Sequence, residues 1–254
     1  MIPYRWYAFV PMEEIMNKRF GAIMFDLDGT LLPMDTEQFM GAYFKELGDY
    51  FAANGYTQEE IIPKVRHATR AMIFNDGKRT NEEVFWETFF GEMGEDARSK
   101  DWDFEPFYNG PFQALQALTG ENKRIRETIQ AARAAADHVI LATNSVFPPC
   151  GIAARLAWLG LEPSDFDLVT TFDNSCFSKP NPLYFKEILE KFNVSVDHAF
   201  MVGNDAQQDA LAATTAGVDT FLITDCLITR GVEWEHYRHG SYDEMLALLK
   251  SFAE

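Results

Sequence analysis

Short apolar runs, each ending in polar or acidic residues, recur along the chain and alternate with segments of helical character. The apolar runs that predict strands occupy residues 20–27, 138–143, 166–171, 198–202 and 219–224. The segments that we expect to be helical are residues 122–136, 148–160, 182–193, 206–216 and 241–252. Apolar strands that alternate with helices are typical of a parallel sheet covered on both faces. The pattern therefore predicts an α/β fold with a doubly wound, mostly parallel sheet.

One long interval, residues 33–118, interrupts this alternation because it holds no convincing strand pattern. Aromatic residues recur there at spacings of three and four, in residues 36–54 and 82–90, which predicts helices with a buried apolar face. We expect a helical insertion at 33–118 within an α/β core made of residues 20–32 and 119–254. Residues 92–105 hold six acidic and two basic side chains and are expected to form a solvated loop. Residues 1–19 form an N-terminal extension to which the sequence assigns no role.

Composition and charge exclude several classes of protein. The 254 residues are enough for a core domain and a smaller one, and 47% hydrophobic residues exclude a disordered chain. The 22 basic and 39 acidic side chains give a net charge of −17, with no basic stripe for nucleic acid. No apolar run reaches the length of a membrane span, about 20 residues, and residues 1–19 lack the order of a signal peptide. The three cysteines, widely spaced, are expected to be buried reduced thiols, so we expect a cytoplasmic protein without membrane partners.

The first candidate for chemistry is Asp26-Leu27-Asp28, directly after the apolar run 20–27. Residues two apart in an extended segment point to the same side, so both carboxylates can address one ligand. Gly29 permits a tight turn after them. Taken alone, the segment is equally well explained as a turn that ends a strand.

A second acidic group follows the run 198–202, where Asp205 and Asp209 stand four residues apart. The ends of parallel strands meet at one sheet edge, so these two and Asp26 and Asp28 should converge there. Unpaired carboxylates would repel one another, and Mg²⁺ is the hard cation that suits such oxygen ligands. The four aspartates therefore predict a magnesium site.

Two further segments carry groups that can hold phosphate oxygens. Thr143 and Asn144 end the run 138–143, and Lys179 precedes Pro180 at the start of a predicted helix. Taken singly, a threonine there is more often a helix cap and a lysine more often a solvated loop residue.

Together these segments resemble a known family. DLDGT at 26–30, TNS at 143–145, KP at 179–180 and GNDAQQD at 203–209 are similar to the four motifs of the haloacid dehalogenase-like hydrolases. The resemblance spans residues 20 to about 224, implies a Rossmann-like core, and likens 33–118 to the family's helical cap. One position departs from the pattern: Asn204 stands where the fourth motif usually has glycine before its first aspartate.

The resemblance implies a role for each aspartate. Asp26 matches the nucleophile that forms an aspartyl-phosphate and also binds metal. Asp28 matches the general acid/base, with its carbonyl oxygen as a metal ligand. Asp205 matches a direct Mg²⁺ ligand, and Asp209 matches a ligand of the metal or of one of its waters.

The remaining motif residues match the groups that hold phosphate. Thr143, Asn144 and Lys179 take this role in the resemblance, with the lysine also offsetting the charge of the nucleophile. Family members that displace halide lack the second aspartate, so Asp28 favours phosphoryl transfer over dehalogenation.

We expect a Mg²⁺-dependent phosphatase that acts on a small phosphorylated metabolite. A hexose-phosphate mutase with the same phospho-aspartate chemistry and a non-catalytic binding module remain as alternatives. Substrate choice should lie in the cap, where Arg66, His67 and Arg70 form either a contact for an anionic substrate or a solvated basic face.

Overall fold

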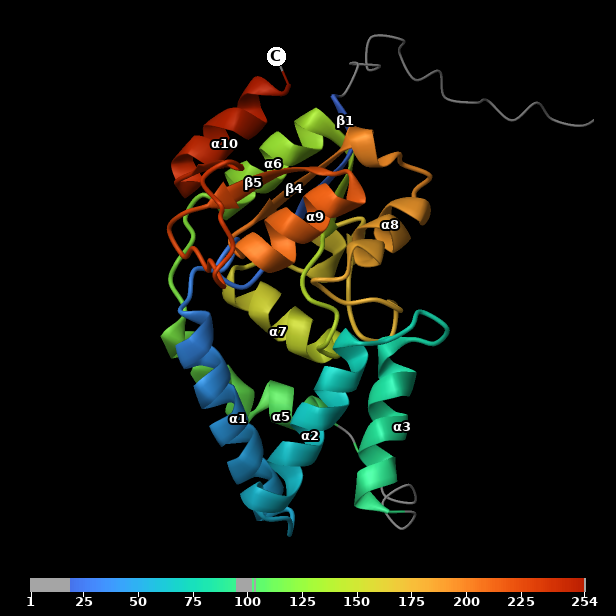
Figure 1. Cartoon of the computed structure of the whole chain (residues 1–254). Coiled ribbons are helices and arrows are strands. Elements are labelled where there is room, and N and C mark those ends of the chain that lie inside the picture. Colours follow the sequence, from blue (N-terminus) through green and yellow to red (C-terminus); the bar gives the residue numbers. More distant parts are fainter. Residues whose placement is uncertain (1–18, 95–101, 103, 254) are drawn as a thin grey trace, which may run out of the picture.

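The computed structural model describes residues 19–94, 102 and 104–253, and its centre is a six-stranded parallel sheet (Figure 1). The strand order is β3-β2-β1-β4-β5-β6, so the order reverses between β1 and β4. The strands are β1 (Phe20–Phe25), β2 (Ala136–Leu141), β3 (Leu168–Val169), β4 (Ala199–Gly203), β5 (Asp219–Ile223) and β6 (Arg238–Gly240). The predicted α/β fold with a doubly wound parallel sheet is confirmed.

Most strand bounds differ from the expected runs by one or two residues, and the larger differences lie in β2, β3 and β6. β2 begins two residues earlier than the apolar run, and β3 keeps only two residues of the run 166–171. β6 was not expected, because Arg238–Gly240 contains no apolar side chain and lies at the exposed edge of the sheet. An edge strand of this kind is defined by backbone pairing with β5, which leaves no hydrophobic pattern in the sequence.

Helices cover both faces of the sheet. Alternate residues of β1 point to opposite faces: Ile23 and Phe25 join one buried cluster, and Ala22 and Met24 join another. The first cluster includes α6 and α10, and the second includes α8 and α9. The helices around the sheet are α6 (Ile125–Ala135), α7 (Pro149–Trp158), α8 (Pro182–Glu190), α9 (Ala212–Ala216) and α10 (Tyr242–Ser251), with short 3₁₀ turns at Pro163–Asp165 and Val196–His198.

The insertion forms helices that lie together beyond one end of the sheet (Figure 1). Asp35, Thr57 and Thr80 each begin a helix by accepting a backbone N–H with the side chain. The helices are α1 (Thr36–Ala53), α2 (Gln58–Ile73), α3 (Asn81–Met93), α5 (Glu105–Asn109) and the 3₁₀ segment Pro111–Leu118. We refer to residues 33–118 as the cap; their division from the core as a separate domain stays a prediction.

Aromatic side chains form the interior of the cap. Trp102 belongs to this interior, with ring centroids 5.9 Å from Phe51 and 4.9 Å from Phe89. The prediction of a solvated loop at 92–105 is therefore wrong at Trp102. Packing of an indole ring against other rings is more favourable in free energy than its exposure to water. Residues 95–101 and 103 of that loop, and residues 1–18 of the extension, lie outside the described residues.

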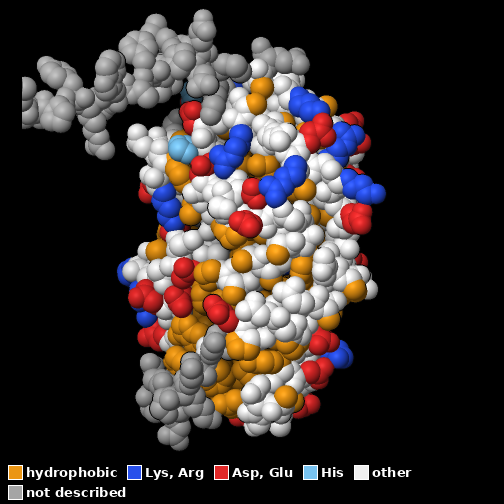
Figure 2. Space-filling view, turned by 180° about the vertical axis from the view of Figure 1, so that it is seen from behind, with side chains coloured by type: hydrophobic (Ala, Val, Ile, Leu, Met, Phe, Trp, Pro, Cys, Tyr) orange, Lys and Arg blue, Asp and Glu red, His pale blue; other side chains and the backbone are white. Residues whose placement is uncertain are grey.

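Seen from behind, lysine and arginine side chains are concentrated over the sheet-containing part, and exposed hydrophobic side chains gather over the cap (Figure 2). Within residues 19–94, 102 and 104–253, no helix is long and apolar enough to span a membrane. Cys150, Cys176 and Cys226 are half-buried, not buried as expected, because all three lie outside the central strands.

Candidate active site

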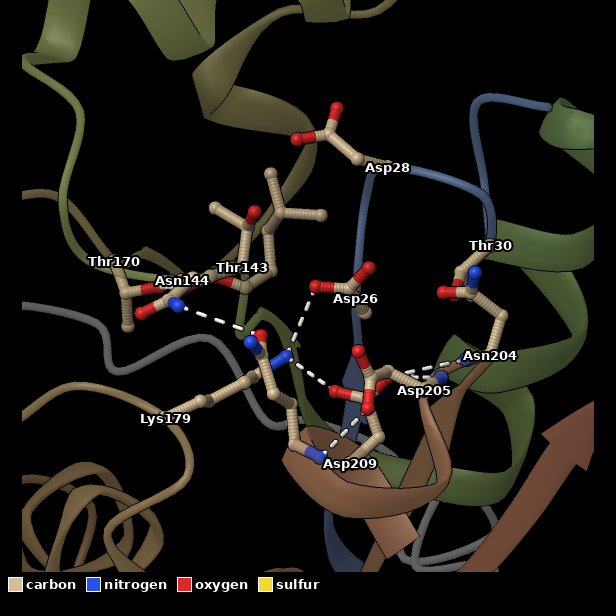
Figure 3. Close-up of polar contacts among 12 residues, drawn as sticks. Asp26, Asp28, Thr30, Thr143, Asn144, Thr170, Lys179, Asn204, Asp205 and Asp209 are labelled. Carbon is tan, nitrogen blue, oxygen red and sulfur yellow. Dashed lines mark hydrogen bonds and ion pairs between the residues drawn. The ribbon is translucent and has the colours of Figure 1, made fainter. Parts of the chain in front are cut away.

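The carboxyl ends of β1 and β4 meet where the strand order reverses, which is where open α/β sheets bind ligands. Asp26 follows β1 and Asp205 begins the turn after β4. The N–H of Asp26 donates to the carbonyl oxygen of Val202 on β4 at 2.9 Å, which fixes the two strand ends against each other. The predicted convergence of these segments is therefore present (Figure 3).

Lys179 joins two of the aspartates. Its ammonium group lies 2.9 Å from Asp26 Oδ1 and 2.6 Å from Asp209 Oδ1, and its side chain is 1% exposed. Burial raises the pKa of Asp26 above its ordinary value; Lys179 acts against this rise, and the charges of Asp209 and Asp28 add to it. Burial also disfavours the charged lysine, but Asp209 and Asp26 hold the pKa of Lys179 above its ordinary value. The two carboxylates therefore favour the charged form of Lys179 beside Asp26.

Asp209 is enclosed by its own loop. Its Oδ2 accepts the N–H groups of Asn204 at 3.1 Å and Asp205 at 3.0 Å, while Oδ1 binds Lys179. Asp209 belongs to a π-helical turn, Ala206–Leu211, where a regular helix over 206–216 was expected. Both carboxylate oxygens thus have internal partners, and the contact with a metal or one of its waters that the sequence resemblance implied stays a prediction.

Asp28 points away from Asp26 and pairs with a residue that the sequence did not identify (Figure 3). Its Oδ2 accepts a hydrogen bond from Nη1 of Arg155 on α7, and the Arg155 side chain is fully buried. The only signal for this residue was an arginine among the apolar residues of IAARLAWL. A buried cation in such a helix requires a partner, but the sequence does not say which one.

Asp205 also has a cationic partner that was missed. Its Oδ1 accepts the N–H groups of Gln207 and Gln208, both at 3.0 Å, and its Oδ2 pairs with Arg230. Three cations of the chain, Lys179, Arg155 and Arg230, offset three of the four negative charges of the aspartates. Repulsion among the aspartates does not by itself require a metal, because these cations already offset it, and the sequence pointed only to the lysine.

Asn204, the departure from the family pattern, locks the turn after Asp28. Its Oδ1 accepts from the Thr30 hydroxyl at 3.0 Å, and its Nδ2 donates to the carbonyl oxygen of Cys226 at 2.7 Å. Gly29 has a φ of 85°, and a Cβ there would lie 2.2 Å from Asn204 Nδ2. Glycine is thus required both by the turn and by the close approach of Asn204.

The predicted phosphate-binding residues lie on the adjoining loops. The carbonyl oxygen of Thr143 accepts from the hydroxyl groups of Thr170 and Tyr184, both at 2.7 Å. Asn144 Nδ2 lies 3.4 Å from Gln208 Oε1, which connects the loop after β2 with the loop after β4. Asn144 Oδ1 is buried and has no partner among the described residues. Thr143, Asn144 and Lys179 lie together on one side of Asp26 (Figure 3).

The donor set fits a hard cation at two of the four aspartates. Asp26 binds Lys179 through Oδ1, which leaves Oδ2 able to bind a metal. Asp205 can join Asp26 once Arg230, whose side chain is 40% exposed, moves away. As the residues stand, no group of three or more acidic, histidine or cysteine side chains in the described part of the chain is arranged to hold a metal.

A cleft of about 1290 Å³ opens between the cap and the loop that carries Arg230. Its lining includes Met40 and Phe44 from α1, Arg66 from α2, and residues 225–230. The guanidinium group of Arg66 lies 4.2 Å from the Phe44 ring centre, whereas His67 is exposed and pairs with Glu92 at 2.6 Å. Arg66 and Arg230 thus bring positive charge to this cleft, and Arg230 also pairs with Asp205.

Comparison with known proteins gives a consistent set of similarities. A family model described as haloacid dehalogenase-like hydrolase matches residues 20–217. The chain is 24% identical over 204 residues to pyrophosphatase PpaX of Bacillus velezensis, covering 80% of this chain and 83% of the relative. It is 28% identical over 206 residues to phosphoglycolate phosphatase of Vibrio parahaemolyticus, covering 80% and 82%. The HAD hydrolase YfnB of Bacillus subtilis, solved bound to magnesium, superposes with a TM-score of 0.52 at 19% identity, over 91% of this chain and 99% of that one.

Proposed function

The chain belongs to the haloacid dehalogenase-like hydrolases, and from this premise we propose that it is a magnesium-dependent phosphatase for a small phosphorylated metabolite. The observation that carries the proposal is Asp26, held by the buried cation of Lys179 at the crevice between β1 and β4. Asp28 follows two residues later, as an acid/base partner would. The phosphatase names of the two curated relatives support the same reaction class.

In the proposed reaction, Asp26 is the nucleophile and Asp28 the acid/base. An oxygen of Asp26 attacks phosphorus, and the bond from phosphorus to the leaving oxygen breaks as that oxygen takes a proton from Asp28. Water then attacks the aspartyl-phosphate and gives its proton to Asp28, which releases phosphate and restores both residues. Lys179 offsets negative charge on Asp26 and on the transferred group throughout.

We assign the magnesium ion to Asp26, the carbonyl oxygen of Asp28, and Asp205. When bound, Mg²⁺ supplies positive charge to the phosphoryl oxygens. Asp209 is assigned a different role from the one that the sequence implied: it positions Lys179 and the loop after β4, because its oxygens already have those partners. Thr143 and Asn144 are assigned to the phosphate oxygens.

The first test is phosphate release from phosphate esters and pyrophosphate, with Mg²⁺ or with EDTA. We expect release only with Mg²⁺, and a fall in kcat of roughly 10³-fold or more in Asp26→Asn, because the amide is a poor nucleophile. Asp243→Asn, at a side chain that is 70% exposed on α10, is the matched control.

Two outcomes would contradict the phosphatase. Isomerised product with little free phosphate would identify a mutase. A folded, Mg²⁺-binding wild-type protein that turns over none of the esters would identify a binding module.

A further inference from the structure

Arg155 is a fully buried cation that touches the proposed acid/base. Its Nε donates to the carbonyl oxygen of Gly151 at 3.1 Å, and its guanidinium group lies 4.2 Å from the centre of the Phe147 ring. Its Nη1 binds Asp28, whereas its Nη2 is buried and has no hydrogen-bond partner in the described part of the chain. The other oxygen of Asp28 is likewise buried and unpartnered. The pair therefore leaves hydrogen-bonding capacity unused on both sides.

Arg155 cannot follow Asp28 if that residue moves. The guanidinium group is held by Phe147 on one face and by the backbone of α7, and Tyr108 of the cap packs against Gly151 so closely that a Cβ there would lie 2.7 Å from its ring. Asp28, in contrast, lies on a turn and its side chain is 21% exposed. Of the two partners, Asp28 is the one that can turn.

The proposed reaction requires such a turn, because Asp28 now pairs with Arg155 and its side chain points away from Asp26 (Figure 3). If Asp28 turned away and nothing took its place, a buried guanidinium group would remain without an anion, which is strongly unfavourable. A second anion that took the place of Asp28 would remove this cost. It would also bind the unpartnered Nη2 through a two-pronged contact, which guanidinium groups favour.

We propose that Arg155 is an anion subsite, and that a second acidic group on the leaving portion of the substrate exchanges with Asp28 there. The substrate is then a phosphate ester that also carries a carboxylate or a second phosphate. Its acidic group binds Arg155, and the side chain of Asp28 is then free to turn toward the leaving oxygen of the phosphate ester. This inference rests on the proposed phosphatase function and specifies its substrate class.

The test compares kcat/KM for three esters with Mg²⁺: p-nitrophenyl phosphate, a phosphorylated hydroxy acid and a sugar bisphosphate. In the wild type we expect at least one of the two acidic esters to exceed the aryl ester. Arg155→Met keeps the side-chain volume and removes the charge, and we expect it to lower the acidic-to-aryl ratio of kcat/KM at least tenfold. A fall in the ratio for the phosphorylated hydroxy acid identifies a carboxylate as the second anion, and a fall for the sugar bisphosphate identifies a phosphate. For that ester KM should rise and kcat should fall, since binding and release of Asp28 are coupled.

Two matched variants distinguish this subsite from an anion site in the cleft and from a purely structural ion pair. Arg66→Met removes the arginine of the cleft, and Arg126→Met removes an exposed arginine of α6 that pairs with Asp165. If the ratio falls in Arg66→Met but not in Arg155→Met, the second anion binds in the cleft and the proposal is wrong. Equal losses for all esters in Arg155→Met, or no loss, would mean that the pair only anchors α7.

Folding failure and failure of the proposed function can both be recognised. If Arg155→Met does not fold, Arg155→Lys keeps the charge but loses the two-pronged contact, and it should lower the same ratio at least threefold; an unchanged ratio overturns the proposal. A wild type that releases no phosphate from any ester contradicts the phosphatase. An active wild type that prefers the aryl ester contradicts the anion subsite alone.

Discussion

The two aspartates after β4 differ in their surroundings despite their closeness in sequence. Each accepts two backbone N–H groups through one oxygen, but the other oxygen of Asp205 pairs with Arg230, whose side chain is 40% exposed, whereas that of Asp209 pairs with the buried Lys179. A metal can replace the exposed cation at Asp205 more readily than the buried cation at Asp209. On this ground we propose that Asp205 is the metal ligand and Asp209 the support, which their spacing alone could not distinguish.

This difference predicts opposite effects of two conservative substitutions. Asp205→Asn should raise the Kd for Mg²⁺ roughly tenfold or more, because it removes a charged ligand. Asp209→Asn should change that Kd less than about threefold, yet lower the free energy of unfolding by on the order of 3 kcal/mol, because it breaks a buried pair. Calorimetric Mg²⁺ titration and urea unfolding measure the two effects. Loss of Mg²⁺ binding in a folded Asp209→Asn protein would restore Asp209 as a ligand.

Arg230 gives a second prediction at this scale. Because its guanidinium group occupies Asp205 Oδ2, it competes with a metal for that oxygen. Arg230→Gln should therefore tighten Mg²⁺ binding, by about three- to tenfold at low ionic strength. Arg238→Gln is the control, since Arg238 pairs with the exposed Asp219. Weaker Mg²⁺ binding in Arg230→Gln would show that Arg230 supports the metal site.

At the scale of elements, α3 connects the cap to the loops of the active site. Asn81, the first residue of α3, is fully buried, and its Nδ2 contacts the side-chain oxygens of Ser145 at 3.1 Å and Ser178 at 3.0 Å. Its own N–H donates to the carbonyl oxygen of Ser175 at 2.8 Å. Ser145 follows Asn144, and Ser178 precedes Lys179, so one cap residue contacts both loops that carry the proposed phosphate-binding residues.

Replacement of Asn81 should therefore loosen the cap and these loops together. Asn81→Leu has similar volume but removes the hydrogen bonds from Nδ2 to the hydroxyl groups of Ser145 and Ser178, at a cost of about 1–3 kcal/mol. We expect faster hydrogen exchange in α3 and around residues 145 and 178. Asn54→Leu, at the exposed end of α1, is the control. Faster exchange in α3 alone would mean that Asn81 does not support the loops.

At the scale of the whole molecule, the cap and the core share one buried cluster. The ring centre of Phe39 on α1 lies 6.2 Å from that of Trp158 on α7, and Phe112 stacks on the same indole ring with 5.2 Å between the ring centres. The continuous cluster extends from β1 to α3 and α10. Separate stability of two domains would require two separate clusters.

We therefore expect one cooperative unfolding transition. Urea titrations followed by far-UV circular dichroism and by tryptophan fluorescence should give the same midpoint. Trp86→Phe and Trp158→Phe variants assign the fluorescence signal to α3 and to α7. A cap signal that is lost at lower urea than the circular dichroism of the sheet would contradict the prediction.

The sequence by itself determined the sheet, the insertion and the residues that carry the motifs. Buried parallel strands require continuous apolar runs, and chemistry at their ends requires particular side chains, so both leave local signals. This is why the sequence alone places β1, β4, Asp26 and Lys179. β6 and the packing of Trp102 left no such signal.

Only the tertiary structure decided how the charges are paired. Arg155 and Arg230 are 127 and 25 residues away from the aspartates that they bind, and nothing in their local sequence specifies those partners. The same is true of Asn81, which reaches serines 64 and 97 residues away. Ion pairs and buried hydrogen bonds depend on distances between side chains, which the chain acquires only when the sheet and cap pack together. The apolar pattern specifies which elements form, whereas their packing determines which cation each aspartate meets.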